Sequence, residues 1–267
     1  MRFLVVAASC CFLIVAVSAC GSDEKSSPAG GTVTQPPAET TDPPAVTGTV
    51  PEQAPTVVTL YFLRDGKLGV AAGFVPSGPR IATAAVNDLL EGPTASDRAA
   101  GLSSAIPRGT KLERLAIEDG VAEVALSSSL GEAATAQVVY TLTRFPTVRR
   151  VELEGEQHVR EDFEDVTPPI LVESPAPGEE VASPLRIEGT ANTFEATFQV
   201  EVLGVDRRVV GKRFVTATSG SGTRGTFDAN VPFSATGGRV TLAVFELSAE
   251  DGSRIHEVRI PLQVGPG

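Results

Sequence analysis

The sequence contains few of the side chains that usually carry chemistry. Its 267 residues include no tryptophan, only three cysteines and only two histidines. The cysteines are Cys10, Cys11 and Cys20, so none follows residue 20. The rest of the chain therefore has no disulfide, no thiolate nucleophile and no cysteine ligand for a metal. Without tryptophan, and with two tyrosines, it also has few aromatic platforms for a sugar ring.

Positive charge is scarce as well. The chain has 22 lysines and arginines against 33 aspartates and glutamates, which gives a formal net charge of −11. Such a chain repels phosphate backbones. The two short arginine pairs, Arg149-Arg150 and Arg207-Arg208, have acidic neighbours and form no basic stripe. We therefore expect no nucleic-acid partner.

Patterns typical of catalytic sites are also missing. His158 and His256 lie far apart, and the sequence contains neither His-Glu-x-x-His nor Gly-x-Ser-x-Gly. Glu152, Glu154 and Glu156 alternate with smaller or apolar residues, which predicts one solvent-facing row of like charges on a strand. The acidic residues 161–165 lack the ligand spacing of a calcium loop. We expect no enzyme, no cofactor and no metal site.

The amino terminus has the features of an export signal. Arg2 is followed by an apolar run through Val17 and then by small residues, which indicates a secretory signal peptide over residues 1–20. The residues Val17-Ser18-Ala19-Cys20 resemble the lipobox of bacterial lipoproteins. This resemblance implies lipidation at Cys20 and anchoring to the extracytoplasmic face of the cell membrane, because two acyl chains suffice for stable attachment. An ordinary signal peptide that contains a cysteine is the alternative.

Residues 21–55 have the composition of a spacer. They are rich in Ser, Thr, Pro, Gly and acidic residues, and Lys25 is their only basic residue. Such a segment buries too little apolar surface to offset its ordering entropy. We therefore expect a disordered tether over residues 21–55.

Residues 56–160 show a mixed pattern that predicts an α+β domain. Strands and helices alternate, with turn residues such as Asp65-Gly66 and Asp119-Gly120 between strands. The expected strands are 57–63, 68–75, 112–117, 121–126 and 148–154, and the expected helices are 81–90 and 138–145. We expect the two helices to cover one face of a single sheet.

The pattern changes to strands alone after an acidic, proline-terminated linker over residues 161–168. Seven short strands with regular turns predict an immunoglobulin-like β-sandwich over residues 169–265. The expected strands are 170–173, 185–189, 198–203, 209–217, 225–231, 240–245 and 255–264. Phe194 and Phe198 are expected in its core. We expect backbone N–H groups to hold Glu195 at the same corner, and a ligand or partner contact through Glu195 is the alternative.

Three segments of the first domain resemble the GerMN domain of sporulation and spore germination proteins. They are Leu89-Leu90-Glu91-Gly92-Pro93, the segment from Ser104 to Leu112, and the segment from Gln137 to Pro146. The second domain resembles the immunoglobulin-like domain of bacterial spore germination. This resemblance is carried by Ser174 to Gly178, Ser183-Pro184-Leu185, Gly189 to Phe198 and Glu246 to Ser253.

These resemblances imply an envelope protein linked to sporulation, germination or cell-wall processes. The leading hypothesis is a non-catalytic binding or assembly module whose partners are the membrane, through its lipid, and envelope proteins or peptidoglycan. The alternative is a peptidoglycan-acting enzyme or an accessory factor of a wall hydrolase. Self-assembly into a homo-oligomer is a third hypothesis, which the net charge disfavours.

Overall fold

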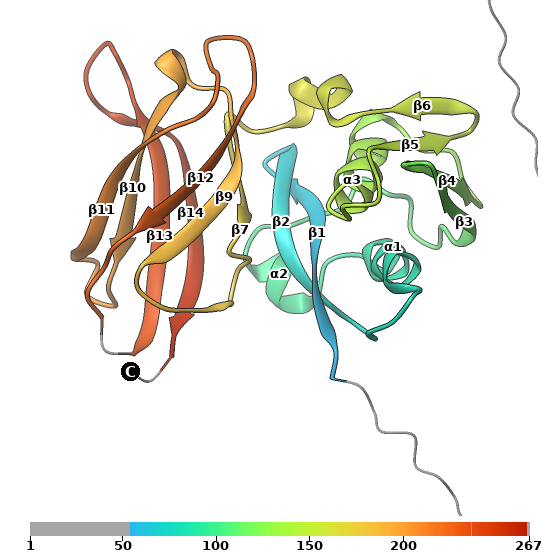
Figure 1. Ribbon diagram of the computed structural model, residues 1–267, viewed down its shortest axis with the longest axis horizontal. Helices are drawn as coiled ribbons and strands as arrows, with labels where there is room; N and C mark the ends of the chain where they lie inside the picture. Colours follow the sequence, from blue (N-terminus) through green and yellow to red (C-terminus); the bar gives the residue numbers. More distant parts are fainter. Residues whose placement is uncertain (1–53, 236, 266–267) are drawn as a thin grey trace, which may run out of the picture. The chain divides into compact units, whose positions relative to one another are not determined.

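The computed structural model describes residues 54–235 and 237–265. The expected signal peptide, Cys20 and all but the end of the expected tether lie outside these residues. The described residues belong to one compact unit. They build two hydrophobic cores, one in the amino-terminal domain and one in the carboxy-terminal domain. Figure 1 shows the helices and strands of the two domains.

The amino-terminal domain is α+β, as the sequence predicts. Its elements are β1 (Thr56–Arg64), β2 (Lys67–Val75), α1 (Ile81–Glu91), α2 (Ala95–Ala99), β3 (Leu112–Glu118), β4 (Val121–Leu126), α3 (Glu132–Leu142), β5 (Arg150–Leu153) and β6 (Glu156–His158). In this part of the chain β1 and β2 form a two-stranded sheet, and a four-stranded sheet has the order β3-β4-β5-β6.

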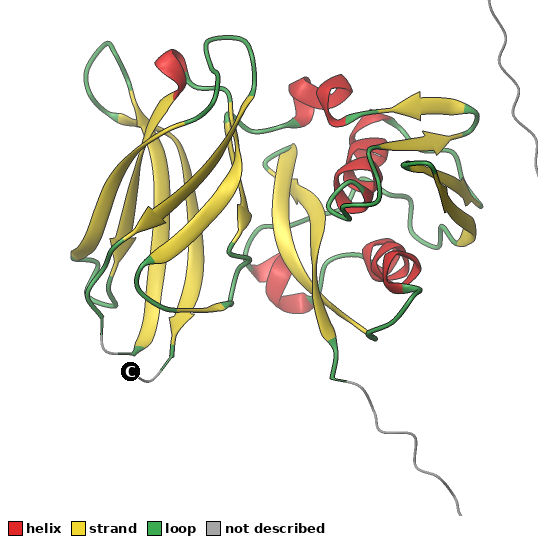
Figure 2. Ribbon diagram, viewed as in Figure 1, coloured by secondary structure: helices red, strands yellow, loops and turns green. Residues whose placement is uncertain are grey.

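Both long helices lie between these two sheets rather than on one face of a single sheet (Figures 1 and 2). The β1–β2 hairpin is separated from the larger sheet by α1 and α3, and the chain after α2 pairs with one position of β1. The backbones of Leu63 and Ser103 exchange two hydrogen bonds there, with N···O distances of 2.7 and 2.8 Å. The sequence pattern predicts which segments are strands, but their division into two sheets depends on how the helices pack between them.

The expected linker folds as a short 3₁₀-helix, η1 (Arg160–Val166). Asp162 accepts a hydrogen bond from the backbone N–H of Val159 at 2.8 Å, which stabilises the start of this helix. Phe163 is only 4% exposed and packs in the core of the amino-terminal domain. The segment is therefore part of the folded structure, although its composition is typical of a linker.

The carboxy-terminal domain is an all-β sandwich, as expected. Its elements are β7 (Ile170–Ser174), β8 (Glu180–Val181), β9 (Leu185–Ala191), η2 (Phe194–Ala196), β10 (Thr197–Leu203), β11 (Val209–Thr216), β12 (Gly225–Val231), β13 (Gly238–Leu247) and β14 (Arg254–Val264). Its described strands form one sheet of order β11-β10-β13-β14-β8 and one of order β12-β9-β7.

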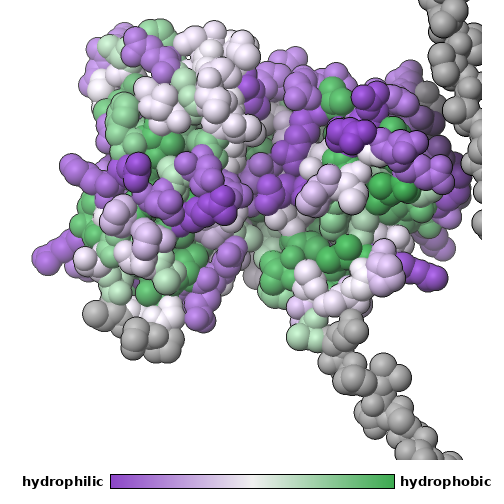
Figure 3. Space-filling model, viewed as in Figure 1, coloured by the Kyte–Doolittle hydropathy of each residue, from purple (hydrophilic) through white to green (hydrophobic). Residues whose placement is uncertain are grey.

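Alternating burial in β9 and β12 places one side of each strand in the sandwich core. Phe198 is buried there, and its ring centroid lies 4.9 Å from that of Phe227. The prediction for Phe194 is wrong, because this residue is 63% exposed. It belongs to η2, in which no residue is buried. Figure 3 shows hydrophilic residues interspersed with hydrophobic ones on the visible face of the sandwich. Arg186 of β9 pairs with Asp228 of β12 in an exposed ion pair.

Candidate functional site

The candidate residues predicted from the sequence do not meet in one place. Cys20 lies outside the described residues. Glu195 is exposed in η2 with a φ of 52°, and its backbone N–H donates to Ser221 Oγ at 3.1 Å. Among the hydrogen bonds of the described residues, none involves the carboxylate of Glu195. The structure therefore gives this carboxylate no local backbone partner of the kind we expected.

The predicted row of carboxylates is divided by a turn. Glu154 has a φ of 53° and forms, with Gly155, the turn that joins β5 to β6. Glu152 lies opposite Gln157, whose side chain donates to its carboxylate at 3.3 Å. The single strand face expected for Glu152, Glu154 and Glu156 is therefore wrong. The three residues instead line an open cavity of about 630 Å³ together with His158.

The other histidine takes part in a local contact of the sandwich. His256 Nδ1 lies 3.0 Å from Glu246 Oε2, and Glu246 Oε1 accepts the backbone N–H of Phe194 at 2.9 Å. Within the described residues, no three His, Cys, Asp or Glu side chains are grouped so that they could hold a metal ion. The same part of the chain has no helix that is both long and apolar enough to span a membrane.

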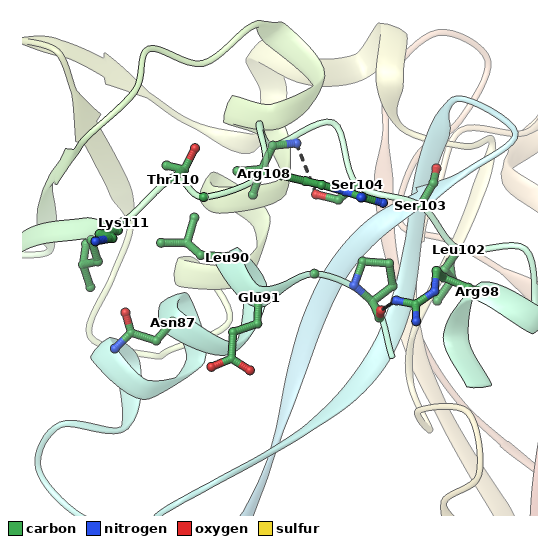
Figure 4. A pocket seen from close by; sticks show the side chains of 15 residues that line it. Asn87, Leu90, Glu91, Arg98, Leu102, Ser103, Ser104, Arg108, Thr110 and Lys111 are labelled. Atoms are coloured by element: carbon green, nitrogen blue, oxygen red, sulfur yellow. Dashed lines mark hydrogen bonds between the residues drawn. The ribbon is translucent and has the colours of Figure 1, made fainter. Parts of the chain in front are cut away.

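Two of the three GerMN-like segments form the walls of one pocket. The cavity has a volume of about 860 Å³ and lies between the end of α1 and the loop that precedes β3. Figure 4 shows the loop with Ser103, Arg108 and Lys111 facing the part of α1 that carries Asn87 and Glu91. Two segments that are separated by about ten residues in the sequence thus meet around one cavity, which makes this pocket the best candidate for a functional site.

The third segment holds the pocket loop in place through Gln137. This side chain of α3 is fully buried. Its Oε1 accepts the backbone N–H of Ala105 at 2.8 Å, and its Nε2 donates to the carbonyl of Tyr61 at 3.0 Å. One amide therefore connects the loop, α3 and β1. The sequence placed Gln137 in a motif, but the position of this amide in the helix does not show which backbone groups it would hydrogen-bond.

The loop itself closes by local hydrogen bonds. Ser104 Oγ accepts the backbone N–H of Ile106 at 3.1 Å, and Thr110 Oγ1 donates to the carbonyl of Pro107 at 2.7 Å. Gly109 has a φ of +85° and open space around it, so this left-handed position favours glycine for backbone reasons alone. The turn places Arg108 and Lys111 on the exposed side of the loop, at the rim of the pocket.

The pocket is locally basic in an acidic chain. Arg98, Arg108 and Lys111 line it, and the only acidic residue among its lining is Glu91. The guanidinium of Arg98 donates to the carbonyl of Pro93. Among the described residues, no hydrogen bond or ion pair occupies the side chain of Arg108 or that of Lys111. Their charges are therefore available to an anionic group such as a carboxylate or a phosphate.

A buried ion cluster joins the two domains. Glu173 of β7 accepts hydrogen bonds from the Tyr61 hydroxyl and from Arg160 Nη1, the latter at 2.6 Å. The guanidinium carbon of Arg160 lies 4.7 Å from the centroid of the Tyr140 ring. Burial, together with the negative charge of Glu173, raises the pKa of Tyr61 well above its usual value. The cluster is saturated with internal partners, so we assign it to holding the domains together.

A second bridge between the domains is more exposed. Arg224 Nε lies 2.7 Å from Glu164 Oε2, and Asn192 Nδ2 donates to Glu164 Oε1 at 2.7 Å. Partial burial raises the pKa of the Glu164 carboxyl, but the hydrogen bonds from Arg224 and Asn192 outweigh it, so the net pKa is lowered. Arg224 also donates to the carbonyl of Pro168 at 2.8 Å. This bridge fixes η1 against the sandwich.

Comparison with known protein families agrees with this two-domain architecture. Residues 59–160 match the family described as "Sporulation and spore germination", and residues 169–253 match the "Immunoglobulin-like domain of bacterial spore germination". The chain carries one domain of each family. Both resemblances predicted from the sequence are thereby confirmed, and neither family description names an enzymatic activity.

Solved structures show weaker likenesses. The tandem GerMN domains of the sporulation protein GerM from Bacillus subtilis are 22% identical, with a TM-score of 0.32, and the match covers 37% of this chain and 38% of that chain. A structure described as a lipoprotein from Clostridium perfringens is 16% identical, with a TM-score of 0.28, and the match covers 43% of this chain and 93% of that chain. The match with GerM thus spans well under half the length of that solved chain. A comparison with curated proteins gives no match.

Proposed function

We propose that this protein is a lipid-anchored, extracytoplasmic binding or assembly module of the cell envelope without catalytic activity of its own. The observation that carries the proposal is the basic pocket built by the GerMN-like segments in a chain of net charge −11. The sequence Val17-Ser18-Ala19-Cys20 supports the lipid anchor. Both matched families are described by germination rather than by a reaction, which supports a binding role.

The domain junction fits a module that presents surfaces in a fixed arrangement. Glu173 is 6% exposed and is held by Arg160 and Tyr61, so relative movement of the two domains would leave a buried charge without partners. Interfaces between domains that lack such contacts usually permit motion. A partner that touches both domains would therefore meet a preformed surface, and ordering it would cost little free energy on binding.

Cross-linked co-purification tests this proposal. The whole chain is isolated from its native membrane after mild cross-linking, in parallel with Cys20→Ala as the control for anchoring. We expect a stoichiometric envelope partner with the natural chain and its loss with the variant. Equal solubility of both chains would contradict the lipid anchor, and the absence of any partner with the natural chain would contradict the binding role.

A wall-directed activity is the second candidate, and one observation favours it. The cavity beside β5 and β6 is lined by Glu152, Glu154 and Glu156 with His158, which is the type of residue that glycoside hydrolysis uses. Such an activity predicts that the natural chain releases soluble fragments from purified peptidoglycan and that Glu152→Gln abolishes this release. Glu195→Gln, in the other domain, should then leave the release unchanged. Absence of any release by the folded natural chain would exclude this activity.

A further inference from the structure

The basic pocket is one end of a longer groove. A second cavity, of about 550 Å³, lies between the start of α1 and β3, and a third, of about 430 Å³, adjoins the turn before α1. Asn87 lines all three cavities, Leu112 lines the first and second, and Arg80 lines the second and third. The three hollows are therefore contiguous along α1, and β3 forms the opposite wall of the second one and reaches the first through Leu112.

The wall formed by β3 is an open strand edge. Within the described part of the chain β3 pairs with β4 alone, although it is the longest strand of its sheet at seven residues. No hydrogen bond of the described residues joins the backbone of β3 to anything beyond β4. Alternate N–H and C=O groups of an edge strand point away from the sheet, so β3 offers them to an added strand. Seven residues at about 3.3 Å each give an edge of roughly 23 Å.

Part of the floor of the groove is apolar, although Glu113 and Arg114 also line it, and basic residues lie toward its two ends. Ala82 of α1 lies on the floor with Leu115 and Ile117 of β3, which are half-buried against the domain core. Arg80 lies toward one end, and Arg108 and Lys111 lie at the other. Alternating side chains of an extended peptide would place every second one on such a floor.

We propose that this groove binds an extended acidic peptide of a partner protein, which adds to β3 as a further strand. Its carboxylate, at the chain end or on a side chain, pairs with Arg108 and Lys111. Since these two residues precede Leu112, a carboxy-terminal carboxylate placed there makes the added strand antiparallel to β3. Antiparallel pairing is the more favourable of the two orientations. The inference rests on the proposed binding function and names the class of partner.

A peptide library tests the inference directly. The whole chain, purified in detergent, is used to select from random heptapeptides displayed with a free carboxyl end. We expect enrichment of acidic peptides with β-branched residues at alternate positions. The double change Arg108→Glu and Lys111→Glu should lower the affinity for an enriched peptide by about tenfold or more. Lys212→Glu, a matched change of an exposed lysine on β11 of the other domain, should leave its affinity unchanged.

Hydrogen exchange distinguishes strand addition from simple charge attraction. A bound peptide should slow the exchange of amides in Leu112–Glu118 and leave those of the β11 edge unchanged. No enrichment, enrichment of peptides without acidic residues, or binding that leaves β3 unprotected would overturn the inference. Concentration-dependent self-association that the double variant abolishes would also overturn it, because the occupant would then be a second copy of the chain.

The two proposals fail in different ways. If a cross-linked envelope partner still co-purifies with the double variant while no peptide binds the natural chain, the groove inference is wrong and the binding function stands. If peptides bind at β3 but no partner is found in the membrane, the groove stands and the envelope function is wrong.

Discussion

Gln137 shows how one side chain determines the shape of the candidate pocket. It is fully buried in α3 and supplies one acceptor to the loop and one donor to β1. Glutamine is seldom buried without partners, since an unsatisfied amide loses its hydrogen bonds to water. The residue type and position were visible in the sequence, but its partners are 32 and 76 residues away. No local pattern reports contacts at such separations.

Replacing Gln137 by leucine should destabilise the domain and disorder the pocket loop. The change leaves the carbonyl of the buried Tyr61 without this donor, and a buried unsatisfied group costs about 1–3 kcal/mol. It also removes the hydrogen bond from the backbone N–H of Ala105, an exposed residue of the loop. We expect the free energy of unfolding, measured by urea denaturation, to fall by about 2–4 kcal/mol. Gln263→Leu, an exposed position on β14, is the matched control and should change it by less than about 0.5 kcal/mol. Equal effects of the two changes would contradict this role.

Short elements are where prediction from the sequence was least complete. The strands and long helices follow from runs of apolar residues, and the seven strands predicted for the sandwich correspond to β7 and to β9–β14. α2, β6, β8 and η1 contain two to seven residues, too few to show a period. In the structure Thr94 and Asp97 form a capping box at the start of α2, since the side chain of each accepts a backbone N–H from the other.

The burial of two phenylalanines is the reverse of what the sequence around each of them suggests. Phe163 lies in the acidic segment expected as a linker but is 4% exposed, whereas Phe194 was expected in the core and is 63% exposed. Truncation of a buried phenylalanine typically costs about 3–5 kcal/mol. We therefore expect Phe163→Ala to lower the free energy of unfolding by about that amount. Phe194→Ala should change it by less than about 0.5 kcal/mol. Thermal and urea unfolding of the two variants, side by side, measure this difference, and a larger cost for Phe194→Ala would refute the assignment.

At the scale of the whole molecule, polar contacts join two domains whose separate cores the sequence already indicates. Apolar periodicity predicts each core because its members recur within one segment. Besides apolar contacts of Leu171 and Ala176 with the amino-terminal core, the junction contains two ion pairs, Arg160–Glu173 and Arg224–Glu164, whose members are 13 and 60 residues apart along the chain. Charged residues usually indicate a solvent-exposed position, so no pattern in the sequence predicts these pairs. The same limit applies to the candidate pocket, whose basic residues are separated by acidic or neutral ones along the chain.

The Glu164–Arg224 bridge makes the stability of the domain junction depend on pH. The pKa of Glu164 is lower in the folded chain than in the unfolded chain, because hydrogen bonds from Arg224 and Asn192 outweigh the effect of partial burial. The unfolded state therefore binds the proton more readily. The contribution of the bridge is complete above the unfolded pKa, near 4.5, and is lost as the pH falls through the lower folded value.

Comparison of Glu164→Gln with the natural chain tests this dependence. The variant removes the charge, so its free energy of unfolding should be lower at pH 7, by about 1 kcal/mol or less for so exposed a pair. The gap should close as the pH falls below 4.5, because the natural carboxyl is then protonated as well. Glu161→Gln, which changes an exposed carboxylate on the same helix η1, is the control. Its free energy of unfolding should follow that of the natural chain at every pH. Urea unfolding between neutral and acidic pH measures all three. A gap that stays constant across this range would mean that packing of the side chain, rather than its charge, stabilises the junction.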